Sequence, residues 1–253
     1  MNSKRGQMAI WIIIAIILVA IILLFFLFRE EIVPTVSEGI KENPKSYIDG
    51  CVKKHVNDVI ELMLPQGGFV SPEHTKLYKD IKVSYLCFNS GNYFPCINEH
   101  PMLLNEMLGE IKNYISPKIE QCFEEYKKEM KKRDIEVNLE SMNLEVKFGI
   151  ERIFVDIKKK ITISKKEESY SLDEFNAEII SPAYELGRVA MEIASQEAEY
   201  CYFEYVGYMN LYPKFRINLD TMSDSTKIYS IEDKNSGKTM NIAIRSCAIP
   251  AGF

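Results

Sequence analysis

The stretch from residue 135 to residue 166 reads IEVNLESMNLEVKFGIERIFVDIKKKITISKK. Apolar and polar side chains alternate along it, which is the pattern of strands that bury one face and expose the other. Gly149 lies near its middle, at the point where one strand should turn into the next. The stretch therefore predicts half-buried antiparallel strands at the centre of the fold.

Helical periodicity appears on both sides of this stretch. Residues 47–64 carry apolar side chains at helical spacing, and Pro65 followed by Gly67 and Gly68 should stop the helix. Another helical segment, the third along the chain, runs from about residue 182 to residue 208 with a similar apolar face. These segments predict helices that pack on the sheet.

The segment that follows Pro101 is compatible with two helical forms. Its apolar stripe continues at helical spacing straight past Pro117, so either one kinked helix or two abutting helices is expected. In the second case Ser116 would be the cap and Pro117 the first-turn proline. The stripe consists of Leu104, Leu108, Ile111, Ile115, Ile119, Cys122 and Tyr126.

The C-terminal part predicts a hairpin. The runs KIYSIE (227–232) and TMNIAIRSC (239–247) flank DKNSGK, which contains residues that favour turns. Helices and strands thus fall in separate blocks, and the predicted fold class is α+β, an antiparallel sheet with packed helices.

An apolar run close to the N-terminus predicts a membrane anchor. Residues 8–28 contain no charged or strongly polar side chain, and a helix of that length spans about 30 Å. Lys4 and Arg5 precede the run, whereas two glutamates follow Arg29, so the N-terminus should stay inside. We expect a cytoplasmic tail (1–7), a transmembrane helix (8–28), a neck (29–45) and a disulfide-bonded α+β extracellular domain (46–253).

All six cysteines lie on the predicted outer side, which indicates three disulfides in an oxidising compartment. Cys87 and Cys96 flank a tip of turn-forming residues, so these two should be bonded to each other. For the other four we favour the pairs Cys51–Cys122 and Cys201–Cys247. An alternative is a metal site formed by Cys87, Cys96 and His100 with His74, although the spacing differs from the paired C-x-x-C arrangement of structural zinc sites.

Charge and motifs exclude several functions. The chain has a net charge of −5, which disfavours nucleic acid binding. The lysines at 158–160, 165 and 166 are expected to lie in solvent along the edge of a strand. The sequence contains no G-x-S-x-G, H-E-x-x-H or phosphate-loop motif. We therefore expect no catalytic residue, no cofactor and no bound metal.

One helix nevertheless carries a candidate acid. Glu197, Glu199 and Glu204 are close in sequence, and Glu197 lies four residues before Cys201 on the predicted packing face. A half-buried carboxylate there would suit a general acid, but a structural glutamate held by hydrogen bonds is the favoured interpretation.

The N-terminal string KRGQ, followed by a long Ile/Leu/Ala run, resembles the N-termini of archaeal type IV pilin-like proteins. The resemblance implies cleavage between Gly6 and Gln7, after which the apolar helix becomes an anchor or the packed core of a filament. The strings YLCFNSGNYFPC, INEHPML, EAEYC, YMNLYP and AIRSCAIPAGF are similar to those of a group of membrane-anchored archaeal surface proteins. That similarity implies export and disulfides, but no activity.

Filament packing would need small residues four apart or a polar residue that fixes the register. Ala9, Ala15 and Ala20 do not share that spacing, and the run contains no acid. We therefore expect residues 8–28 to remain in the lipid bilayer as a signal-anchor, whether or not Gly6 and Gln7 are cleaved apart.

Two functions follow as hypotheses. The first is a single-pass cell-envelope protein with a non-enzymatic role, which binds an envelope protein or copies of itself. The second is an anchored extracellular hydrolase with a carboxylate or serine site near Glu197 or within residues 167–178.

Overall fold

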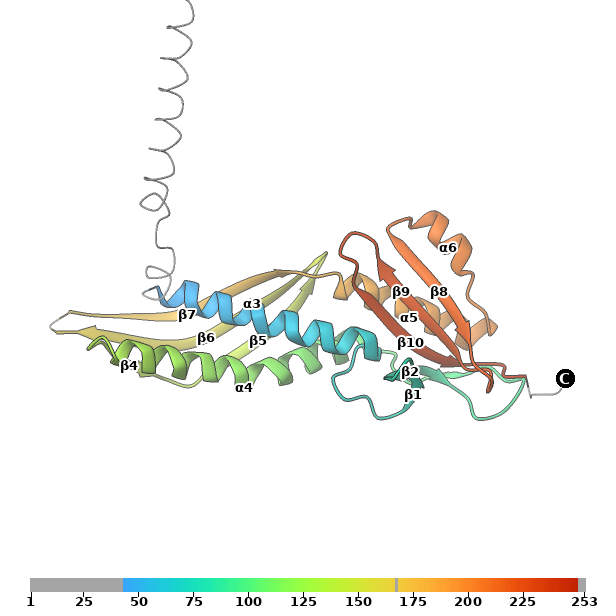
Figure 1. The fold of residues 1–253 in the computed structure, drawn as a ribbon, viewed down its shortest axis with the longest axis horizontal. Helices are drawn as coiled ribbons and strands as arrows, with labels where there is room; N and C mark the ends of the chain where they lie inside the picture. The colour runs from blue at the N-terminus through green and yellow to red at the C-terminus, as the bar shows by residue number, and fades with distance from the viewer. Residues whose placement is uncertain (1–42, 167, 250–253) are drawn as a thin grey trace, which may run out of the picture. The chain divides into compact units, whose positions relative to one another are not determined.

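The computed structural model describes residues 43–166 and 168–249 (Figure 1). The chain divides after Pro44, and the fold described below is that of the unit that begins at Lys45. The predicted tail, anchor and processing site lie outside the described residues. None of the helices within the described ranges combines the length and the apolar character needed to span a bilayer.

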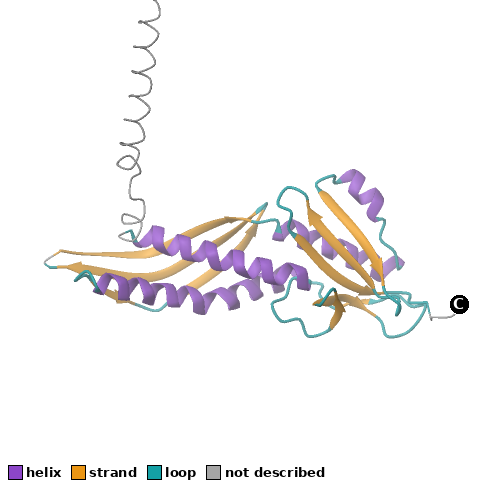
Figure 2. Cartoon of the chain, in the orientation of Figure 1, coloured by secondary structure: helices purple, strands orange, loops and turns teal. Residues whose placement is uncertain are grey.

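The fold class is α+β, as predicted, but the strands form two sheets. The first sheet contains β4 to β7, and helices α3 and α4 lie along it (Figures 1 and 2). The second contains β1, β2, β3, β8, β9 and β10, and α5 packs against β2, β9 and β10. The helices are α3 (Pro44–Met63), α4 (Leu103–Lys131), α5 (Ala183–Tyr200) and α6 (Tyr205–Leu211), with a short 3-10 turn, η1 (Leu64–Gln66). The strands are β1 (Thr75–Tyr78), β2 (Ile81–Phe88), β3 (Ile97–Asn98), β4 (Glu136–Leu139), β5 (Asn143–Gly149), β6 (Arg152–Lys165), β7 (Glu168–Ile180), β8 (Phe215–Thr221), β9 (Lys227–Asp233) and β10 (Thr239–Arg245).

The first sheet is antiparallel throughout and is centred on β6. Strands β4 and β5 share one side of β6, and β7 pairs with the other side. Along β6 every second side chain is buried, as the alternating pattern predicts. Because β6 lies inside the sheet, the expectation of a strand edge is wrong, although all of these lysines except Lys159 are exposed to solvent, as expected.

Lys159 is the clearest exception to the expected solvated lysine run. Its position in the alternation places it on the buried face, where it is only 2% exposed. The ammonium donates to Glu120 Oε1 at 2.8 Å and to the Glu140 carbonyl at 2.5 Å, and it lies over the Phe123 ring. A buried ammonium is tolerated here because these acceptors replace its hydration.

The helices follow the predicted faces, α4 takes the single-helix form of the two alternatives, and only the third segment differs from its prediction. In α3 the apolar positions at helical spacing are all buried, and Pro65 with Gly67 ends the helix through the η1 turn. These positions are Ile48, Val52, Val56, Val59, Ile60 and Met63. In α4 the chain runs through Pro117 as one helix, and the Ser116 hydroxyl donates to the Lys112 carbonyl instead of capping a second helix. The third predicted segment breaks at Cys201, whose backbone is left-handed (φ +58°), into α5 and α6.

The second sheet is mixed, which corrects the expectation of an antiparallel sheet. The predicted hairpin of β9 and β10 is present, but β10 also pairs with β2 in parallel, with Tyr85 opposite Ala243. A parallel neighbour requires a long connection, and here most of the chain separates the two strands. The largest cluster of buried apolar side chains is continuous from α3 and α4 into this sheet, so the unit has one main core.

The structure contains the three disulfides that the sequence favours: Cys51–Cys122, Cys87–Cys96 and Cys201–Cys247. The first joins α3 to α4, and the second closes the loop between β2 and β3. The third joins the end of α5 to the segment after β10. Cross-links of this kind are typical of exported proteins.

Removing the disulfides one at a time should destabilise the fold in order of loop length. Cys51 and Cys122 are 71 residues apart, and Cys87 and Cys96 are 9 apart. The chain-entropy relation gives a loss of about 4 kcal/mol for a Cys51→Ala, Cys122→Ala variant and about 2.5 kcal/mol for the Cys87, Cys96 counterpart. Urea denaturation without reductant measures both values, and the reverse order would contradict this account.

Candidate functional site

Glu197 is the most buried carboxylate of the described residues, with an exposed fraction of 0%. It projects from the last turn of α5 toward β9. Both of its oxygens lie 2.8 Å from the Lys227 ammonium, and Oε1 also accepts a hydrogen bond from the Tyr229 hydroxyl. Both oxygens of the carboxylate therefore have hydrogen-bond partners within the protein.

The surroundings of Glu197 support a structural role. Burial, followed by the nearby Glu197 charge, raises the pKa of the Tyr229 phenol far above its usual range, so Tyr229 remains a neutral donor. Lys227 also donates to the Cys201 carbonyl at 2.7 Å, close to the C-terminal end of α5. Of the other two candidate acids, Glu199 is exposed and Glu204 caps α6 through the Gly207 amide.

A chain of contacts connects Glu197 to the loop closed by Cys87 and Cys96. The Ser246 hydroxyl donates to the Glu197 carbonyl at 2.8 Å and accepts from the Cys96 amide at 3.1 Å. One residue further, Cys247 is bonded to Cys201. The end of α5, the end of β10 and the 89–96 loop are therefore held at one point.

The 89–96 loop is also held along its length by backbone bonds to the segment 245–248. The Asn89 amide donates to the Arg245 carbonyl, the Tyr93 amide to the Ala248 carbonyl, and the Cys247 amide to the Phe94 carbonyl, each within about 3 Å. These bonds and two disulfides fix the loop on the end of β10.

The Arg245 side chain also holds the 89–96 loop through hydrogen bonds. Its guanidinium donates to the carbonyls of Asn89 and Gly91 and to the Asn92 side-chain oxygen. Arginine suits this task because its planar fork offers several donors in fixed directions. The loop is thus ordered without burying its own apolar side chains.

Those apolar side chains point to solvent. Tyr93 is 58% exposed, Phe94 is 65% exposed, and Ile249, beside them on the adjoining segment, is 59% exposed. We call these three residues the exposed tip. Tyr93 also has a left-handed backbone (φ +66°), which costs an L-residue of this size about 1 kcal/mol or more. Because the aromatic rings are exposed on a covalently held loop, the exposed tip is a candidate contact surface.

A second surface feature lies between α5 and α6. A groove of about 840 Å³ runs past both helices, the turn between β5 and β6, and the start of β8. Its walls are largely apolar and aromatic, and the charged residues on it include Glu185 and Arg188. We call it the α5–α6 groove.

The residues proposed for the alternative metal site are not gathered as a ligand set. Cys87 and Cys96 are bonded to each other. His74 and His100 line a hollow of about 360 Å³, where His74 Nδ1 lies 2.9 Å from Glu99 and His100 Nδ1 lies 2.6 Å from Glu106. Each imidazole therefore has its own carboxylate partner.

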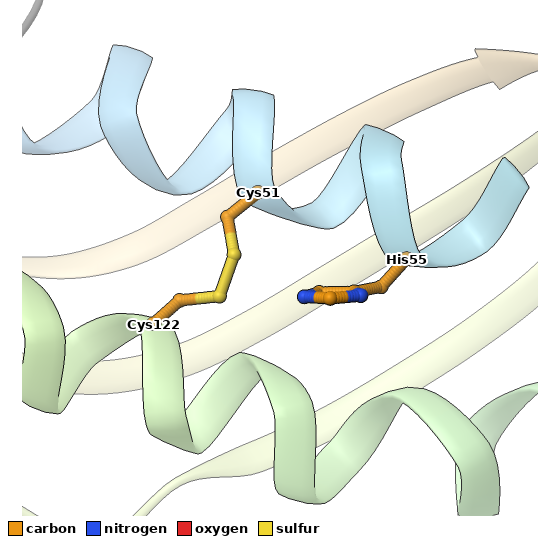
Figure 3. Close-up of side chains that lie close together, drawn as sticks. All are labelled: Cys51, His55 and Cys122. Carbon is orange, nitrogen blue, oxygen red and sulfur yellow. A yellow bond between two sulfur atoms is a disulfide. The ribbon is translucent and has the colours of Figure 1, made fainter. Parts of the chain in front are cut away.

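A different cluster brings metal-ligand residue types together. The ligand atoms of Cys51, His55 and Cys122 lie within 4.8 Å of one another, with Cys51 and His55 on one face of α3 (Figure 3). The two sulfurs are bonded, so neither is available as a thiolate ligand. His55 Nδ1 lies 3.3 Å from an Asp58 oxygen without the geometry of a hydrogen bond. In this form the cluster is a disulfide beside an imidazole.

In comparisons with protein-family models, with curated proteins and with solved structures, this chain has no match.

Replacing Glu197 with glutamine should lower the free energy of unfolding by about 3 kcal/mol. The change keeps an acceptor for Tyr229 but leaves the Lys227 ammonium, whose side chain is only 19% exposed, without a counter-charge. Glu199→Gln is the matched control, since that side chain is exposed on the same helix and should lose less than about 0.5 kcal/mol. Equal urea midpoints for the two variants would show that Glu197 has no special structural role.

Proposed function

We propose that this chain is a single-pass cell-envelope protein whose disulfide-bonded domain binds another envelope protein through the exposed tip. In this proposal residues 8–28 anchor the chain in the cell membrane, and the N-terminus is cytoplasmic. The later residues are extracellular, and the role is non-enzymatic.

The observation that carries the proposal is the construction of the tip. Protein interfaces draw most of their binding energy from a few aromatic or arginine side chains. Such side chains contribute more when they are ordered before binding, because less conformational entropy is lost on association. Tyr93 and Phe94 meet both conditions, since they are exposed and their loop is held by disulfides, backbone bonds and Arg245.

Three disulfides support placement outside the cell. The apolar run, its flanking charges and the pilin-like N-terminal string support an anchor whose N-terminus faces the cytoplasm. A surface position and a preorganised apolar tip together favour recognition of a neighbouring protein. The hydrolase hypothesis has less support, because Glu197 is buried and both of its oxygens are bound by Lys227 or Tyr229.

Replacing Tyr93 and Phe94 with serine should reduce capture of the partner at least tenfold. Loss of two hot-spot rings removes more than about 1.4 kcal/mol of binding free energy, which corresponds to a factor of ten. The measurement is chemical crosslinking of the full-length protein on intact cells, with mass spectrometry to identify and quantify the captured neighbour.

Ile180→Ser is the matched control, because Ile180 is also an exposed apolar residue but lies on β7 in the first sheet. It should leave crosslinking unchanged. Undiminished capture by the tip variant, or an equal loss in both variants, would contradict the proposal. Capture of a second copy of this chain through the tip would identify self-association as the form that binding takes.

A further inference from the structure

The α5–α6 groove contains a buried acceptor that the described protein leaves unused. Glu185, in the first turn of α5, lines the groove and is only 9% exposed. Its Oε1 accepts a hydrogen bond from the Glu151 amide at 2.7 Å, whereas its Oε2 is buried with no hydrogen-bond partner among the described residues. An unsatisfied buried carboxylate oxygen is unfavourable, and natural structures rarely keep one without a reason.

The two cationic side chains that line the groove, Arg188 and Lys214, contact other residues. Arg188, one turn further along α5, lies over the Tyr184 ring at 5.8 Å. Lys214 lies 3.5 Å from a Glu151 oxygen and over the Phe215 ring. Within the described ranges, neither is paired with Glu185. These neighbours therefore supply no donor to Glu185 Oε2, and a donor from an occupant of the groove can reach it only if the side chains that cover it move.

The rest of the groove indicates what kind of occupant that is. Tyr208 and Tyr212 place their rings 4.7 Å apart on the α6 side of the groove. Aromatic faces beside a carboxylate favour a planar cation that stacks and donates hydrogen bonds at once. Ile150 and Leu211 also line the groove and are 78% and 77% exposed, so they offer apolar contacts to neighbours of that cation.

We propose that the α5–α6 groove binds a polypeptide segment of a partner protein in which an arginine or lysine is flanked by apolar side chains. The basic side chain enters among the groove's aromatic rings, moves the side chains that cover Glu185 Oε2 and donates to that oxygen. The flanking side chains cover Ile150 and Leu211. This site is separate from the exposed tip, so it extends the proposed function without depending on it.

The test uses a phage-displayed library of random ten-residue peptides, selected on the full-length protein in detergent. Selected peptides should contain one arginine or lysine next to apolar or aromatic residues. They should bind Glu185→Gln at least tenfold more weakly than the unchanged protein. Glu192→Gln is the matched control: Glu192 also lines the groove but is exposed and already accepts from Gln196, so affinity should stay within twofold.

Glu185→Gln should not harm the fold, because its amide oxygen can still accept from the Glu151 amide and the neutral amide costs less to bury than the carboxylate charge. The melting temperature of the free protein should therefore stay the same or rise by about 2–4 °C. A fall of that size would mean that Glu185 acts in the fold, and it would overturn the proposal.

Three binding results would also overturn it: failure to select any peptide, selected peptides without a basic residue, or equal affinity for Glu185→Gln. Selected peptides that match residues 29–42 of this chain would identify its own neck as the occupant and would overturn the choice of a partner protein. The Tyr93→Ser, Phe94→Ser variant should retain peptide binding, so failure at the groove is distinguishable from failure at the tip.

Discussion

The ion pair between Glu197 and Lys227 is the interaction on which the candidate contact surface depends. It fixes the end of α5 against β9. The Ser246 hydroxyl then connects this end to the loop, because it donates to the Glu197 carbonyl and accepts from the Cys96 amide. The Cys201–Cys247 disulfide closes the same junction covalently. Because the ion pair is buried, the loss of either partner would leave an uncompensated charge in the core. This junction holds the 89–96 loop while its aromatic side chains remain in water.

The sequence predicted those features of the fold that local patterns encode. The buried side of α3, the alternation along β6 and the hairpin of β9 and β10 all follow from side-chain periods of 3.6 and 2. The pairing of Cys87 with Cys96 follows from the turn residues between them. For the candidate site, the sequence identified Glu197 as a residue on the packing face and favoured a structural role for it.

Features that depend on distant partners were not predictable in this way. Lys227 is 30 residues from Glu197, and Ser246 is 150 residues from Cys96, so no periodicity connects them. The parallel pairing of β2 with β10 was not predictable for the same reason, since the sequence of neither strand indicates which strand it pairs with. Lys159 shows a different limit: the alternation places it on the buried face, but residue type alone indicated solvent. The α5–α6 groove is lined by residues of α4, the β5–β6 turn, α5, α6 and the start of β8, which meet only in the folded chain.

The central claim is that the loop carrying the exposed tip is rigid before any partner binds. Native-state hydrogen exchange of the unliganded protein tests it most directly, because the Asn89, Tyr93 and Cys247 amides have defined backbone acceptors in this account. We predict that these amides are protected from exchange to nearly the same degree as those of β10. Glu197→Gln should lower the protection of these three amides more than it lowers the protection of the β6 amides. Exchange of the three amides at the rate of an unstructured peptide, while β10 stays protected, would contradict the account.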